Sequence, residues 1–378
     1  MALTQVLLFL WHWAVASFAM FWAVLWSLLL GFILSAMVQA YVPKGGLAKL
    51  LGRAGLRELA LSSALGAASS SCSYAAAATA KSLFKRGANF TTAMVFMFAS
   101  TNLVIELGLV LWRLLGWAFV LAEWLGGLVL IAVFAALSKL LISPVAARAG
   151  REHVEKGRGT SGHDHGEMIA PGATLAEKVR SGEGWRYVSH YFQMDWSMLQ
   201  TDLVLGFVIA GLLAVAVPAT WWQHLFLSGA PTAMRAIENA LVGPIIAILS
   251  FVCSIGNVPL AAVLWNAGSS FGGVIAFLYA DLLVLPLIDV YRRYYGWPLA
   301  LKMAGVFYLS MVIAALIVEW TYRALRAVPP HTGNLLAMVE HVGLGYTTAL
   351  NAVFLIIVGA LVWWGNRPSR ARPAAVGR

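Results

Sequence analysis

Long apolar runs separated by short polar segments dominate the chain. A helix that crosses a bilayer needs about 20 mostly apolar residues. Seven uninterrupted runs reach that length, at 17–41, 91–112, 117–143, 198–221, 272–291, 298–322 and 345–365, and the pattern predicts a membrane-spanning helix in each. Residues 1–16 are also apolar and lack a basic start or a small-residue cleavage site, so we do not expect a cleaved signal peptide.

Two further apolar stretches, 58–84 and 236–266, are interrupted by residues that break helices. The interruptions are Gly66 and the serine run 69–71 in the first, and Gly243, Pro244, Gly256 and Pro259 in the second. Basic residues flank the first stretch on both sides, which is typical of the cytoplasmic side of a membrane. We therefore expect it to enter and return as a re-entrant hairpin that turns near 67–73.

The two interrupted stretches belong to an internal repeat. Cys72-Ser73 recurs as Cys253-Ser254. The same offset of 181 positions pairs identical residues of several different types, such as Gly87 with Gly268. After a one-residue gap, the Arg-Leu-Leu-Gly-Trp sequence at 113–117 aligns with Arg-Tyr-Tyr-Gly-Trp at 293–297. We interpret the membrane part as two homologous halves, about 17–143 and 198–322.

The predicted fold is an all-α polytopic membrane protein with two repeats, each containing a broken or re-entrant helical segment, plus an extra C-terminal helix. Three spans and one hairpin in each half would invert the second half relative to the first, an architecture common among secondary transporters. If both interrupted stretches cross fully, the repeats are parallel instead. The expected parts are an N-terminal membrane repeat at 1–143, a hydrophilic loop at 144–197, a C-terminal membrane repeat at 198–322, and a helix with a basic tail at 323–378.

Composition supports the membrane assignment. The chain is 61% hydrophobic and 11% charged, whereas soluble proteins carry roughly 25% charged residues. Its two cysteines exclude a disulfide framework and a cysteine-cage metal site. The net charge of +10 comes from basic residues between apolar runs, which is the placement of juxtamembrane anchors that meet lipid and not of a nucleic-acid surface.

The segment 144–197 is rich in charge and glycine and reads as a flexible cytoplasmic loop. It contains His163, Asp164 and His165, a tract of imidazoles and a carboxylate that can collect a divalent metal ion. The alternative is a solvated linker that contains a chance histidine pair.

Ionisable residues inside the apolar runs point to a transport path, because a charge at mid-bilayer costs at least about 2.5 kcal/mol. Asp281 and Glu106 are predicted to line a central cavity, and one of them to carry a coupling proton, with Asn102 as a polar contact on the face of Glu106. The alternative for Glu106 is an ion pair with Arg113. Four other charged residues lie near predicted span ends and read as interfacial anchors: Glu123, Asp289, Lys302 and Glu319.

The helix breaks carry the candidate substrate contacts. Cys72 and Cys253 occupy equivalent positions, where they could bind a soft metal or metalloid or could pack as small hydrophobic residues. Ser73, Ser254 and Asn257 offer polar groups beside helix ends, either for a polar solute or only to cap the helices.

Four motifs make the family recognisable: SCSYAA at 71–76, FASTNLVIEL at 98–107, VCSIGNVPL at 252–260 and YADL at 279–282. They resemble the predicted-permease family that includes the bacterial organoarsenical efflux permeases. The resemblance implies a permease of the bacterial inner membrane. Some relatives have a Cys-Ser-Cys-Gly pattern where this chain has Tyr74 and Ile255, so only a Cys72–Cys253 pair could supply two thiolates to an arsenical here.

The function expected from these features is secondary efflux of a small solute, such as an organoarsenical or a soft metal or metalloid species, coupled to protons. The chain has no phosphate-binding loop to power primary transport, and no cofactor is expected. One alternative is a membrane subunit that binds a metal or a partner protein through 144–197. An intramembrane enzyme is disfavoured, because the histidines of the membrane part lie near predicted span ends and away from Cys72 and Ser254.

Overall fold

The computed structural model describes residues 2–41, 51–69, 73–156, 175–218, 221, 224–227, 229–250, 254–331 and 346–367. These residues form helices and no strands, so the predicted all-α class is confirmed. The helices are α1 (Ala2–Tyr41), α3 (Leu56–Ser69), α4 (Ser73–Lys85), α5 (Phe90–Asn102), α6 (Ile105–Leu115), α7 (Trp117–Leu141), α8 (Pro144–Lys156), α9 (Leu175–Arg180), α10 (Gly182–Ala216), α12 (Thr232–Ser250), α13 (Ser254–Asn266), α14 (Phe271–Tyr279), the 3-10 helix η1 (Ala280–Leu283), α15 (Leu285–Tyr295), α16 (Trp297–Ala324) and α18 (Tyr346–Gly365).

Five helical segments in the described part of the chain are long and apolar enough to cross a membrane. Two bent pairs raise the number to seven: α5 with α6, bent by 44°, and α14 and η1 with α15, bent by 43°. The bent pairs fall on the predicted runs 91–112 and 272–291. The predicted run 198–221 forms only the second part of the longer helix α10, whose shorter apolar portion is Leu203–Ala216.

The first interrupted stretch folds as a helical hairpin, α3 and α4, packed against α5. Its two ends lie together, because the carbonyl oxygen of Leu51, before α3, accepts hydrogen bonds from the Asn89 amide and the Thr92 hydroxyl, each at 2.8 Å. The chain therefore returns to the place where the stretch began. That this place is a membrane surface stays a prediction.

The second stretch repeats this arrangement with α12 and α13. The Arg235 guanidinium, near the start of α12, donates to the carbonyl oxygen of Gly268, after α13, at 2.6 Å. Each hairpin also ends in the same helix-stop motif, in which a glycine at positive φ closes the last turn. Gly87 and Gly268 have φ of 110° and 100°, a conformation that costs glycine little.

The two hairpins begin and end at opposite ends of α7, a helix about 37 Å long. At its C-terminal end, Ser138 hydrogen-bonds to Thr91 beside the ends of the first hairpin, at 3.0 Å. At its N-terminal end, Phe119 packs on Trp265 beside the ends of the second, with ring centroids 5.2 Å apart. Opposite entrances are what inverted repeats require. The common origin of the two halves stays a prediction.

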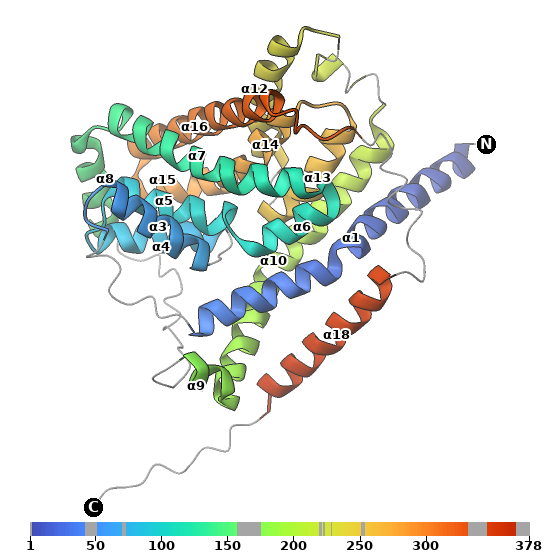
Figure 1. Cartoon of the computed structure of the whole chain (residues 1–378), viewed down its shortest axis with the longest axis horizontal. Coiled ribbons are helices and arrows are strands. Elements are labelled where there is room, and N and C mark those ends of the chain that lie inside the picture. Colours follow the sequence, from blue (N-terminus) through green and yellow to red (C-terminus); the bar gives the residue numbers. More distant parts are fainter. Residues whose placement is uncertain are drawn as a thin grey trace, which may run out of the picture.

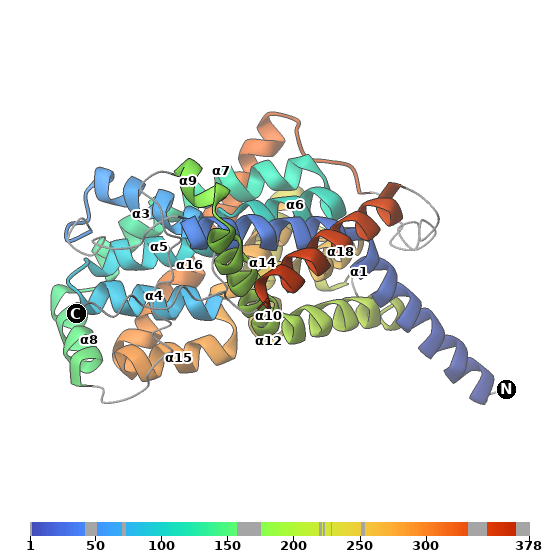
Figure 2. The ribbon, with the colours of Figure 1, turned by 90° about the horizontal axis from the view of Figure 1, so that it is seen from below.

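The two hairpins and the helices α5, α7 and α14 that pack with them form the paired core. Three long helices, α1, α10 and α18, pack together beside it. Figure 1 shows α18 alongside α1 at one edge of the molecule, and Figure 2 shows the N-terminal end of α1 projecting beyond the other helices. A buried amide ties α18 to α1: Asn351 accepts from the Trp26 amide at 2.9 Å and donates to the carbonyl oxygen of Trp22 at 2.8 Å.

The segment 144–197 differs from the flexible loop that its composition predicts, because all but one of its described residues past Ser143 lie in helices α8, α9 and the start of α10. Helix α8 lies against the membrane core: Arg151 donates to the carbonyl oxygen of Ala88 at 2.8 Å and covers the ring of Phe84. This contact supplies the tertiary packing that stabilises a short polar helix.

Candidate functional site

Asp281 lies at the centre of the paired core, in the short 3-10 helix η1 where α14 gives way to α15. Its side chain is 0% exposed. The Ser73 hydroxyl donates to Oδ2 at 3.0 Å, and the side chains of Ser254 and Thr101 also interact with the carboxyl group. Oδ1 has no hydrogen-bond partner among the described residues. The site therefore holds a buried acid with one oxygen available to a further group.

Ser73 and Ser254 are the first residues of α4 and α13, the returning arms of the two hairpins. Two helices from different halves of the chain thus begin at one carboxyl group. The N-terminal end of a helix carries partial positive charge and free amide groups. The arrangement favours negative charge at this point, held by Asp281 or by a bound solute.

Two amides from the predicted site lie beside residues that interact with Asp281. Asn102, the last residue of α5, donates from Nδ2 to the Thr101 hydroxyl at 3.0 Å, and its Oδ1 has no partner among the described residues. Asn257, one turn after Ser254, accepts from Ser250 at 3.3 Å, and its Nδ2 likewise lacks a described partner. Both amides are almost completely buried, so each has a hydrogen-bonding atom to offer.

Glu106 lies on the next helix, α6, and its place in a central cavity stays a prediction. The prediction that it shares a helix face with Asn102 does not hold, because α5 ends at Asn102 and a bend of 44° separates it from α6. Glu106 instead packs against Gly31 of α1 and interacts electrostatically with Asp195 of α10. The described contacts of Asp281 do not include it. Its proposed alternative partner, Arg113, donates to the Thr347 hydroxyl at 3.1 Å.

Two of the four predicted anchors were interpreted wrongly. Glu123 and Glu319 are both 0% exposed and do not reach toward the interface. The apolar residues on either side of each glutamate in the sequence do not indicate that neighbouring helices cover its side chain. Lys302 is exposed, and Asp289 pairs with Arg292 and Arg293 at a partly exposed position, as anchors would.

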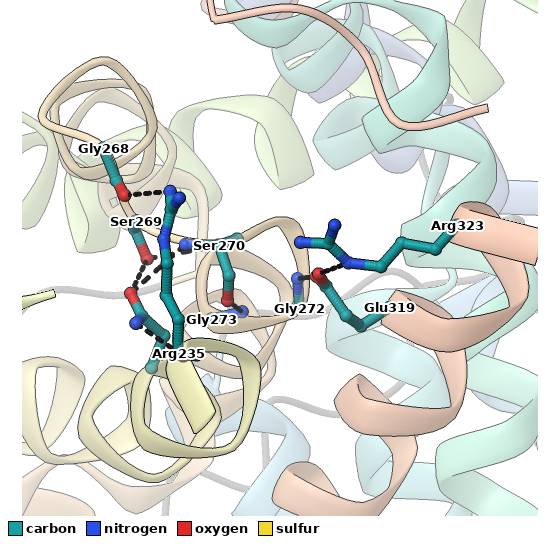
Figure 3. Close-up of polar contacts among 9 residues, drawn as sticks. Arg235, Gly268, Ser269, Ser270, Gly272, Gly273, Glu319 and Arg323 are labelled. Atoms are coloured by element: carbon teal, nitrogen blue, oxygen red, sulfur yellow. Dashed lines mark hydrogen bonds and ion pairs between the residues drawn. The ribbon is translucent and has the colours of Figure 1, made fainter. Parts of the chain in front are cut away.

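Glu319 caps the start of α14 (Figure 3). Its carboxyl group accepts hydrogen bonds from the Gly272 amide and from the guanidinium of Arg323. On the other side of the same helix start, the Arg235 guanidinium binds the carbonyl oxygen of Gly268. This polar network holds α12, α14 and α16 together where the second hairpin begins.

Several predicted ligands lie outside the described residues. These are Cys72, Cys253, His163, Asp164 and His165. Within the described ranges, no group of three or more histidine, cysteine, aspartate or glutamate side chains could hold a metal ion. In the sequence, each cysteine directly precedes a serine that contacts Asp281.

Comparison with known proteins bears on most of the membrane part. The family model described as "Predicted permease" matches residues 12–320. A Mycobacterium tuberculosis protein named "Putative permease Rv2963" is 46% identical over 324 residues, which cover 85% of this chain and 79% of that protein. No solved structure matches the chain. The match confirms the resemblance drawn from the motifs and favours a transporter over an enzyme. With its apolar helices, the chain is a multi-pass membrane protein that belongs to the predicted-permease family.

Proposed function

We propose that this permease is a proton-coupled secondary transporter in which Asp281 binds the coupling proton and the two helix breaks bind a small solute. The observation that carries the proposal is the meeting of Ser73 and Ser254, the first residues of two helices, at the buried carboxyl group of Asp281. A solute bound here would touch both halves of the molecule.

Two features of the surroundings of Asp281 have opposite effects on its charge, and this balance suits reversible proton binding. Complete burial disfavours the ionised carboxylate, whereas the hydroxyl of Ser73 and the two helix N-termini favour it. A group balanced in this way can gain and lose a proton when the solute or water replaces one neighbour. The unpartnered Oδ1 is the atom that would bind the proton.

Alternating access would follow from the two inverted halves. The hairpins begin at opposite ends of α7, so a small rotation of one half against the other would open the central group to one side and then to the other. In this proposal the two halves are repeats and the hairpins are re-entrant.

We extend the proposal to efflux across a bacterial inner membrane. An organoarsenical or another soft metalloid species fits if Cys72 and Cys253, which flank the serines of the site in sequence, supply thiolates. A small polar solute held by Asn102, Asn257 and the serines requires no thiolate.

The test is a toxicity and uptake panel in a deletion strain, with methylated arsenicals, soft metals, divalent metals and small anions. The chain should confer export of one class, and Asp281→Asn should abolish its proton dependence at an unchanged protein level. Export with an unaltered pH dependence in Asp281→Asn would overturn the role of Asp281. Cys72→Ser and Cys253→Ser then separate the classes, because only a soft solute needs the thiolates.

A further inference from the structure

Glu123 is a second buried acid, and the mechanism above does not use it. It lies in the first half of α7, and its side chain is 0% exposed. Neither carboxyl oxygen has a hydrogen-bond partner among the described residues. Buried polar atoms in native proteins are nearly always satisfied. A carboxyl group in this position therefore holds a proton, a water molecule or a ligand that the described chain does not supply.

The face of α7 that carries Glu123 packs against both bends of the core. Gly126 and Gly127, three and four positions on, lie on the same face. A Cβ atom added at Gly126 would collide with the hydroxyl of Tyr279, at the end of α14, and one at Gly127 would lie 2.7 Å from the side chain of Leu103, just after α5. The glycines allow α7 to come within direct reach of the segment that carries Asp281.

The carboxyl groups of Glu123 and Asp281 interact electrostatically across this helix contact. Within the described ranges, no basic side chain donates a hydrogen bond to Glu123 or to Oδ1 of Asp281, and Oδ2 accepts from Ser73. Two carboxylates without a cation between them repel each other in a low dielectric. The pair therefore favours states in which at least one member holds a proton.

The other elements packed against α7 bring few titratable groups to this place. Helix α14 contributes Tyr279, whose hydroxyl donates to the α7 backbone at 3.0 Å. Helix α16 contributes Tyr322, which donates to the same helix at 3.2 Å, and the acid Glu319, whose carboxyl group is bound by Arg323 and by the Gly272 amide. Helix α5 contains no titratable residue, and the two of α6, Glu106 and Arg113, contact α1 and Thr347 instead. Asp281 is thus the acid whose charge bears on Glu123.

We propose that Glu123 is a second proton-binding residue of the transport path, which exchanges a proton with Asp281. The proposal rests on the proposed function of Asp281. In the step, the O–H bond of one carboxyl group breaks as an O–H bond forms on the other, directly or through water, so that one proton moves and one carboxylate is left. Glu123 lies toward the N-terminal end of α7, where the second hairpin begins. It therefore transfers the proton between Asp281 and the side of the membrane at which the second hairpin begins.

The test uses pH-difference infrared spectra of the purified full-length protein, because the carbonyl stretch of a protonated carboxyl group needs no known substrate. We expect Glu123→Gln to remove one protonated-carboxyl band and to shift the pH midpoint of the band that Asp281→Asn removes. Asp281→Asn should shift the Glu123 band in turn, since the coupling of two titrating groups is reciprocal. Glu123→Asp keeps a carboxyl group and should retain both bands.

Glu155→Gln is the matched control, because Glu155 is exposed on α8, and its spectrum should keep both bands that Glu123→Gln and Asp281→Asn remove. A Glu123→Gln spectrum that matches the wild type, or two midpoints that do not respond to each other's substitution, would overturn the proposal. The spectra report on the carboxyl pair alone. Failure of the proposed function would appear separately, as proton-dependent export that survives Asp281→Asn.

Discussion

Ser73 and Asp281 form a hydrogen bond of 3.0 Å across 208 positions of sequence, and it joins the returning arm of the first hairpin to the second half of the chain. Hydrogen bonds to charged groups contribute about 1.5–3 kcal/mol. We expect Ser73→Ala to lower transport at least about tenfold, since about 1.4 kcal/mol is a factor of ten. Transport rates in proteoliposomes at several pH values measure the loss.

Ser82→Ala, on the same helix α4, is the control for a general effect of losing a hydroxyl. Combining Ser73→Ala with Asp281→Asn should add little to the effect of Asp281→Asn alone, because the hydroxyl acts through the carboxyl group. Additive losses would show that the Ser73 hydroxyl contributes independently of Asp281.

A second prediction concerns the packing of the hairpins. A Cβ atom at Gly66 of α3 or at Gly243 of α12 would lie 2.5 Å from a backbone oxygen of the partner helix, that of Phe96 or of Gly273. Backbone cannot move aside as a flexible side chain can, and overpacking costs about 1–3 kcal/mol. We expect Gly66→Ala and Gly243→Ala each to lower the melting temperature in detergent.

The control for this pair is Gly305→Ala, on α16, where an added Cβ atom meets nothing within 4 Å. Alanine is the better helix former there, so the melting temperature should stay the same or rise. Equal melting temperatures for Gly66→Ala and Gly305→Ala would contradict the close approach of α3 to α5.

The sequence supports the prediction of the fold better than that of the site. Apolar runs report the length of a span directly, and the offset that pairs Gly87 with Gly268 identifies the two hairpin ends that share one helix-stop motif. Asp281 stands out because an acid within a long apolar run with no basic neighbour in sequence has few structural explanations.

The surroundings of Glu106 and Glu123 could not be predicted from the sequence. Grouping Glu106 with Asn102 assumed one continuous helix, but the backbone bends between them. Reading Glu123 as an anchor relied on its distance from the end of a span, whereas the decisive fact is which helices cover it. The pair Gly126-Gly127, one turn after Glu123, is the signal that could have indicated a close helix contact on that face.

A third prediction concerns the entrances of the hairpins. With Cys72 and Cys253 replaced by serine, single cysteines introduced by Arg57→Cys and Arg86→Cys should react with a membrane-impermeant reagent from one side of the membrane. Both positions are exposed at the two ends of the first hairpin. Thr232→Cys, exposed at the start of the second hairpin, should react from the other side. Labelling is measured in intact and permeabilised cells.

Opposite-sided labelling of positions 57 and 86 would mean that the first stretch crosses fully, and the re-entrant arrangement would fall. Same-sided labelling of 57, 86 and 232 would contradict the inverted relation of the two halves.

The last prediction concerns pH and the contact that His331 makes outside the spans. Its ring stacks on Trp265 with centroids 3.8 Å apart, and Nδ1 donates to the carbonyl oxygen of that residue at 2.9 Å. Burial lowers the pKa of His331 below its ordinary value of 6.5. Between the lowered pKa and about pH 6.5, the unfolded chain therefore binds a proton more readily than the folded one.

Stability from this contact should thus be complete above about pH 6.5 and should be lost as the pH falls toward the lowered pKa of His331. His331→Phe keeps an aromatic ring on Trp265 but cannot titrate, so the fall in melting temperature between about pH 7 and pH 5 should be smaller than in the wild type. His190→Phe, at an exposed histidine, is the control and should keep the wild-type fall. Parallel melting curves for the wild type and His331→Phe across this range would mean that the ring titrates alike in the folded and unfolded chain.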